Sequence, residues 1–374
     1  MTGPARQRKH LIYNSQSQLT IAMPPAPPSF GSQEYWNMRF IANPVPFEWL
    51  EAPTALDPYI IDALKEIEAP NPQLLHIGCG TSLLSYHLRA HVEKPSQIHN
   101  LDYSDVAIKL GRKREAEIFE AGWSASGEEA TSAEPDRNSL ESDQEKLSTP
   151  ATSTAANSPS SCMRWSSANL LDHSSLLRTC QASAYSIVVD KSTSDSIACS
   201  DDLYVPLPYH VVAASPQSMK TNVTESPEPL HPLHIMAVHL ALVTKPGGRW
   251  ISLSYSMNRY PFLQLPTPES ANGSSQPMQT TASVSQAPQQ GTAGDEAESN
   301  DEVSLDDDLD DIPVKVLKDG FPDPSTLWKL VGKYDIEPQT ASEATKGNET
   351  THRPKVSHWI YVLERTNVPL YIRT

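Results

Sequence analysis

The stretch at 74–88, LLHIGCGTSLLSYHL, constrains the fold more than any other part of the chain. It starts as an apolar strand, passes two glycines on either side of Cys79, and continues with the apolar spacing of a helix. Gly78 and Gly80 leave backbone N–H groups open to a ligand, and the positive end of the next helix adds to the attraction. The stretch therefore predicts a ligand-binding turn between a strand and a helix.

The residues around the turn narrow the class of ligand. The dinucleotide pattern G-x-G-x-x-G needs a glycine at position 83, where this chain has Leu83. A phosphate loop needs a lysine directly after its last glycine, but Gly80 is followed by Thr81. Asp102 comes directly after the next predicted strand, about 20 residues past the glycines. A carboxylate at this place can accept hydrogen bonds from both ribose hydroxyls. A nucleoside without pyrophosphate fits best, and S-adenosylmethionine is the leading candidate. The alternative is a tight strand–helix turn without a ligand.

The hydrophobic patterns continue this alternation of strands and helices along the chain. They predict strands at 73–77, 97–101, 185–189, 249–254 and 356–364, and helices at 56–67, 82–91, 104–120, 231–243 and 327–334. Asp57 is the expected N-cap of the first of these helices, with Pro58 at its first position. A β-α-β-α series is typical of an α/β domain with a parallel sheet and helices on its faces.

Composition divides the chain into a core and loose segments. With 33 prolines and a formal net charge of −16, the chain departs from a compact globule. We predict a flexible tail at 1–30 and a single domain at 31–374, interrupted by disordered insertions at about 121–161 and 264–311. The aromatic run at 35–49 predicts burial of several rings. The acidic balance argues against direct nucleic-acid binding.

Several function classes are disfavoured by what the sequence lacks. The N-terminus has no apolar signal core and no apolar span reaches about 18 residues, which predicts a cytoplasmic protein, or a nuclear one, without a membrane segment. No metal site is expected, since the cysteines form no C-x-x-C pair and His231, His234 and His239 do not match H-E-x-x-H. Cys79 is interpreted as a small side chain under the ligand and not as a nucleophile.

Four segments in order resemble the class I S-adenosylmethionine-dependent methyltransferases. They are LLHIGCGTS, NLDYS, SIVVDKSTSDSI and KPGGRWISLS, and VSHWIYVLE fits the last strand of that fold. The resemblance implies a Rossmann-like, seven-stranded, mostly parallel sheet with an antiparallel last strand, helices on both faces, and S-adenosylmethionine as cofactor. EYWNMRF followed by FEWL is similar to a methyltransferase-like subgroup that includes lysine methyltransferases of translation elongation factor 1-alpha.

The subgroup implies transfer of a methyl group to a protein lysine, with elongation factor 1-alpha as the candidate protein substrate. Two alternatives remain: a small-molecule methyltransferase, and a catalytically inactive methyltransferase-like protein that binds partners. By the resemblance, the cofactor is held by Arg39, Gly78, Cys79, Gly80, Asp102, Tyr103, Asn169 and Asp190. As a hypothesis, Asp190, Thr193 and Asp195 line the acceptor channel, with Lys191 at its mouth.

The sequence departs from the family pattern at four positions. His76 stands where the broad class often has an acid, and Ser82 replaces the third glycine of the loop. Asn169 stands where many members have Asp, although its oxygen can still accept a hydrogen bond. Ser192 stands where the subgroup has glycine before Thr193, beside the expected active site.

Overall fold

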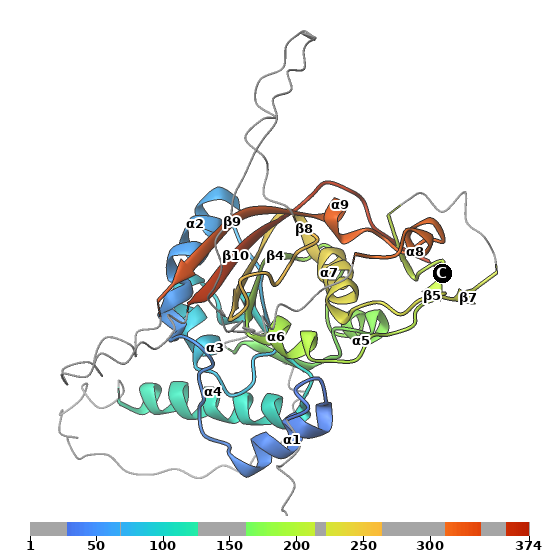
Figure 1. Ribbon diagram of the computed structural model, residues 1–374. Helices are drawn as coiled ribbons and strands as arrows, with labels where there is room; N and C mark the ends of the chain where they lie inside the picture. The colour runs from blue at the N-terminus through green and yellow to red at the C-terminus, as the bar shows by residue number, and fades with distance from the viewer. Residues whose placement is uncertain are drawn as a thin grey trace, which may run out of the picture.

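The computed structural model describes residues 28–67, 69–125, 162–213, 222–263, 311–337 and 357–373. The predicted tail as far as residue 27 and most of both predicted insertions lie outside the described residues. The centre of the molecule is a seven-stranded sheet in the order β3-β2-β1-β4-β8-β10-β9 (Figure 1). Its strands come from five of these described parts of the chain, so the sheet holds the parts together as one core.

Six of the seven strands run in one direction. The strands are β1 (Leu74–Ile77), β2 (Ile98–Asp102), β3 (Arg164–Ser167), β4 (Tyr185–Lys191), β8 (Thr244–Ser254), β9 (Trp328–Ile336) and β10 (His358–Arg365). Only β10 is antiparallel to its neighbours, β8 and β9. Two small sheets pair β5 (Pro206–Leu207) with β7 (Thr224–Glu225), and β6 (Val211–Val212) with β11 (Tyr371–Ile372). The predicted parallel sheet with an antiparallel last strand is therefore confirmed.

Helices cover both faces of the large sheet (Figure 1). On one face lie α2 (Asp57–Ile67), α3 (Leu84–His87), the 3-10 turns η1 (Pro53–Leu56) and η2 (Leu88–His91), and α4 (Asp105–Ala125). On the other lie α5 (His173–Leu177), α6 (Thr193–Ala198), α7 (Pro232–Val243), α8 (Val314–Lys318) and α9 (Pro324–Leu327). Helix α1 (Gln33–Ala42) contacts α4, and η3 (Pro95–Gln97) leads into β2.

The central strand β4 is mostly apolar because both of its faces are buried. In β4, Ile187 and Val189 pack toward α2, while Val188 packs toward α7. Successive side chains of a strand point to opposite faces, so a strand between two helical layers has apolar residues at most of its positions. Helix α7 is buried along its whole length, which explains why it is apolar on every side.

The structure corrects the prediction at 327–334, which is not a helix. Helix α9 ends at Leu327 and β9 begins at Trp328. In β9 the residues Trp328, Leu330 and Gly332 are buried while Lys329 and Val331 are exposed, which is the period of two of a strand. Pairing along β10 stabilises this strand, and that long-range contact outweighs the local pattern. Strand β3 was also not predicted from the sequence.

A second correction concerns Asp57, which does not cap a helix by itself. The 3-10 turn η1 runs directly into α2, so Asp57 already lies within a continuous helical segment. Its carboxylate instead accepts hydrogen bonds from His87 and His91, 30 and 34 residues away in sequence.

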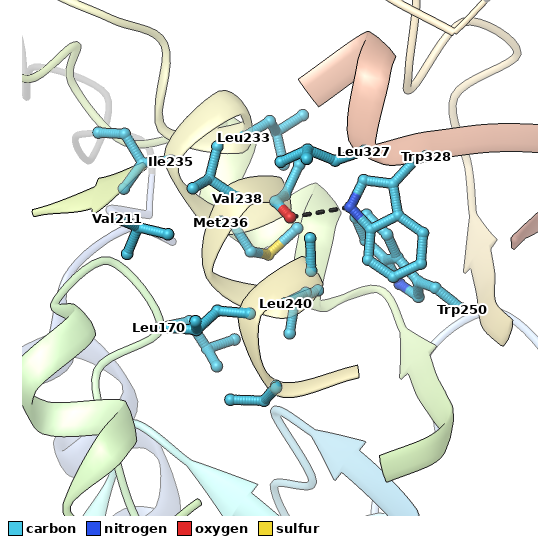
Figure 2. Packing of buried hydrophobic residues seen from close by; sticks show 14 of the residues in the cluster. Leu170, Val211, Leu233, Ile235, Met236, Val238, Leu240, Trp250, Leu327 and Trp328 are labelled. Atoms are coloured by element: carbon cyan, nitrogen blue, oxygen red, sulfur yellow. Dashed lines mark hydrogen bonds between the residues drawn. The ribbon is translucent and has the colours of Figure 1, made fainter. Parts of the chain in front are cut away.

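Trp328 joins the sheet to α7 in the larger core. Its Nε1 donates to the carbonyl oxygen of Ala237 at 2.8 Å, the bond drawn as a dashed line in Figure 2, and its ring packs on Trp250. We expect Trp328→Phe to lower the free energy of unfolding by about 1–3 kcal/mol, because it removes this bond and leaves a small void. Urea unfolding measures the change. The half-buried Trp359→Phe is the control, and an equal effect there would contradict the prediction.

Candidate active site

A cavity open to solvent lies at the carboxyl ends of β1, β2 and β4, and the empty space in it and at its mouth is about 1070 Å³. Its walls are the glycine turn after β1, the ends of β2 and β4, and the aromatic segment at 30–49. Ligands bind at this edge of open parallel sheets because the loops that leave neighbouring strands diverge there. Of the predicted site residues, the cavity is lined by Arg39, Gly78, Cys79, Gly80, Asp102, Tyr103, Asn169, Lys191 and Thr193.

The glycine turn is a close fit that only glycine allows. Gly78 has φ +54°, and a Cβ there would lie 2.1 Å from Oγ1 of Thr193. That hydroxyl donates to the carbonyl of Ile77 at 3.0 Å, so β1 and the start of α6 touch at this point. Cys79 between the glycines is buried, and burial together with the charge of Asp102 raises the pKa of its thiol well above the usual range. The thiol therefore stays protonated, which agrees with a packing role.

Asp102 connects the second strand to the glycine turn. Its Oδ2 accepts from the N–H of Gly80 and its Oδ1 from the N–H of Ser104, both at 2.7 Å. Burial raises the pKa of Asp102 to about 6, although these backbone donors act in the opposite direction. The carboxylate is thus fixed in orientation at the cavity wall, with lone pairs left for the hydroxyls of a ligand.

Glu48 was not singled out from the sequence, yet it joins three walls of the cavity. Its carboxylate accepts from Oγ of Ser82 at 2.8 Å, from the N–H of Leu83 at 2.5 Å, and from Nζ of Lys191. Lys191 also donates to the carbonyls of Trp49 at 3.1 Å and Glu51 at 3.0 Å. Three acceptors therefore occupy the ammonium group of Lys191, which is a tether at the cavity and has no donor left for a substrate.

Arg39 lies among the aromatic rings of the N-terminal segment. Its guanidinium carbon is 4.8 Å from the ring centre of Phe47, 5.4 Å from that of Trp49 and 6.0 Å from that of Trp36. These rings and Phe40 line the cavity, as does Phe30 at the boundary of the predicted tail. The rings of Phe47, Trp49 and Trp36 therefore already make cation–π contacts with a residue of the chain itself.

The other wall of the cavity carries Tyr103 and Asn169. Tyr103 follows β2 and its ring is partly exposed. Asn169 follows β3, and its Oδ1 accepts from the N–H of Leu171 at 2.9 Å. This bond fixes the amide plane, and a second lone pair and the NH₂ group remain for a ligand.

Asp190 and Asp195 are placed in the core and not at the cavity. Asp190 is fully buried and accepts from the N–H groups of Thr193 at 2.9 Å and Ser194 at 3.3 Å, so it caps α6. Asp195 pairs with the buried Arg259 at 3.0 Å. Asp190 lies near the end of β4 and Asp195 in the first turn of α6, and both side chains are buried.

Comparison with known proteins adds one informative relative. No family model matches the chain. Methyltransferase srdJ of Neurospora crassa is 26% identical over 250 residues, which covers 67% of this chain and 77% of that protein. The seven-stranded sheet with its antiparallel strand, the glycine turn and the acid at the end of β2 are the features of one known fold. This is the class I methyltransferase fold.

Solved structures match at low similarity. The cyclase SpnF is 10% identical with a TM-score of 0.39, over 91% of this chain and 98% of that chain. A SAM-dependent methyltransferase of Anabaena variabilis is 9% identical with a TM-score of 0.37, over 90% and 94%. Similarity at this level is too low to support any conclusion beyond those from the sheet order and the cavity.

Besides Asn169, the three other departures from the family pattern have distinct surroundings. His76 is buried and bonded to Ser85 at 3.0 Å, and burial lowers its pKa to about 3, so it is neutral. Ser82 uses its hydroxyl on Glu48. Ser192 has φ +65°, a left-handed conformation that suits glycine. A glycine at this position would therefore relieve backbone strain that Ser192 retains.

Ser192 gives a direct test of that strain. We expect Ser192→Gly to raise the free energy of unfolding by about 0.5–1 kcal/mol, because a left-handed residue with a side chain costs about 1–2 kcal/mol and the added chain entropy of glycine offsets part of the gain. Urea unfolding at neutral pH measures it. Ser196→Gly in α6 is the control and should destabilise; a loss of stability in both variants would contradict the account.

Proposed function

We propose that the chain is an S-adenosylmethionine-dependent methyltransferase that acts on a small, neutral or acidic molecule. The fold, the methyltransferase relative and the residues at the cavity support the enzyme class and the cofactor. The proposed class of methyl acceptor rests on one observation, which is how few carboxylates line the cavity. Among the described residues that line it, Asp102 is the only acid, and it is the residue proposed to hold the ribose.

The residues fit the cofactor by their chemistry. Gly78 and Gly80 let the backbone approach the methionine portion, and Asp102 accepts from the ribose hydroxyls. Asn169 binds the edge of the adenine, and Arg39 binds the cofactor carboxylate. The sulfonium of the bound cofactor supplies a methyl group that is already activated. The chain has to align the acceptor and exclude water, which the apolar rings at 36–49 are suited to do.

A protein lysine as acceptor, the first expectation from the sequence, has weaker support. A lysine must lose its proton before transfer, and a carboxylate at the acceptor end would favour this step. Asp190 and Asp195 point into the core, and Glu48 is bonded to Lys191. The cation Arg39 lies among the aromatic rings where an ammonium group would enter. This charge pattern disfavours an ammonium acceptor and favours a neutral or acidic one.

Two measurements test the proposal in sequence. Titration calorimetry with S-adenosylhomocysteine should show saturable binding to the purified full chain; no binding would overturn the enzyme and favour the inactive interaction protein. Lysate incubated with the enzyme and labelled cofactor is then divided into protein and small-molecule fractions. Label in small molecules supports the acceptor class, whereas label only in a protein band, such as one at the mass of elongation factor 1-alpha, overturns it and keeps the enzyme.

A further inference from the structure

Away from the cavity, three side chains with metal-ligating atoms converge on one point. Nε2 of His87 lies 2.6 Å from Oδ1 of Asp57, and Nε2 of His91 lies 2.8 Å from the same oxygen. The three ligand atoms all lie within 4.8 Å of one another. Asp57 comes from the first turn of α2, whereas the histidines come from α3 and η2, so two separate segments form the cluster.

We propose that Asp57, His87 and His91 bind a divalent cation of the zinc class. Two imidazoles and one carboxylate form a donor set that suits Zn²⁺, Co²⁺ or Ni²⁺ and not Mg²⁺ or Ca²⁺, which prefer oxygen ligands. The histidines are four residues apart on a continuous helical segment, the spacing that places two imidazoles on one side of a helix. This proposal is independent of the methyl-transfer function.

The geometry needs only a small adjustment to hold an ion. Neighbouring ligand atoms of a tetrahedral zinc ion at roughly 2.0–2.2 Å from the metal lie about 3.3 Å apart. The two nitrogen–oxygen distances are shorter than this by less than about 1 Å, which rotation of the carboxylate can supply. The side chain of His91 is 9% exposed, while those of His87 and Asp57 are 26% and 27% exposed. His91 therefore anchors the cluster in the interior, whereas His87 and Asp57 are partly open to solvent. Water can complete the coordination of an ion on that open side.

The position of the cluster indicates a structural role for the ion. Helix α2 packs on β4 and β8, while α3 and η2 follow directly from the glycine turn. A metal bond between them would join the segment after the turn to the centre of the sheet. Two hydrogen bonds already connect these parts, and an ion would replace them with stronger coordinate bonds that unfolding must break.

Zinc chloride titrated into the metal-free full chain tests the site. Cys162 and Cys199, the exposed thiols, are replaced by serine in every sample so that they do not bind the metal. We expect one saturable site by calorimetry and a rise in the thermal midpoint with excess Zn²⁺. His87→Gln and Asp57→Asn should each weaken the affinity by at least about tenfold. His173→Gln is the control, because His173 belongs to another histidine pair, stacked on His210.

The outcomes separate a metal site from a hydrogen-bonded cluster. Selective weakening in both variants, with Co²⁺ absorption free of thiolate bands, supports the proposal. Absence of saturable binding, or equal affinity in the parent chain, His87→Gln and Asp57→Asn, overturns it. If one variant is too unstable to titrate, the other still decides, because each removes one ligand from a different segment.

Discussion

Asp102→Asn is expected to lower the affinity for S-adenosylhomocysteine by about 10- to 100-fold. Asparagine keeps the size of the side chain but removes the charge, and a hydrogen bond to a charged group contributes about 1.5–3 kcal/mol. Titration calorimetry at neutral pH measures the change. Asp105→Asn is the control, since Asp105 is exposed at the start of α4, and it should bind like the parent chain. Unchanged affinity in Asp102→Asn would remove Asp102 from the ribose site.

The pKa of Asp102 adds a dependence on pH to the same prediction. Because burial raises this pKa to about 6, the carboxylate gains a proton as the pH falls through about 6. A protonated acid accepts fewer hydrogen bonds from ribose hydroxyls, so the affinity should fall below pH 6 and level off above it. In Asp102→Asn this dependence should disappear. An identical pH profile in both proteins would show that another group controls binding.

The raised pKa of Asp102 has the opposite effect on folding stability: affinity should fall at low pH, whereas the contribution of Asp102 to stability is present at low pH. A carboxyl group whose pKa is raised in the folded state contributes stability that is present at low pH and is lost as the pH rises through its folded pKa, here about 6. The amide of Asp102→Asn resembles the protonated acid at every pH. We therefore expect this variant to unfold at an equal or higher urea concentration at neutral pH, which separates weak binding from poor folding.

Lys191→Met is expected to lower the free energy of unfolding by about 2–4 kcal/mol. The substitution leaves the carboxylate of Glu48 and the carbonyls of Trp49 and Glu51 without their donor, and removal of one partner from a buried pair is strongly destabilising. Affinity for S-adenosylhomocysteine should fall as well, since Glu48 also holds Ser82 and Leu83 of the glycine turn. Urea unfolding and calorimetry measure the two effects.

Two further variants define the Lys191 prediction. Lys65→Met removes an exposed ion pair with Asp62 and should change neither stability nor affinity. Combining Lys191→Met with Glu48→Gln should recover part of the lost stability, because the uncompensated charge is then gone. If Lys191→Met were as stable as Lys65→Met, the bonds of Lys191 would not contribute to the free energy of unfolding.

The residues that form the cavity were predictable from the sequence only in part. Gly78, Gly80 and Asp102 were predicted from spacing, and the structure places all three at one cavity. Glu48 gave no local pattern, because its partner Lys191 lies 143 residues away. Asp190 at the end of β4 and Asp195 in the first turn of α6 lie near the cavity in sequence, but their side chains bond to Ser252 and Ser254 in the core. Position along the chain was predictable there, and side-chain direction was not.

The sequence by itself determined the alternation of strands and helices that is typical of a parallel sheet, and the glycine turn. These features follow from the period of apolar residues and from the backbone freedom of glycine, both of which act within a few residues. Only the tertiary structure decided that 328–336 is a strand, that Lys191 is tied to Glu48, and that Asp57 meets His87 and His91. Each depends on contacts between distant segments, which form only when the packed core brings those segments together.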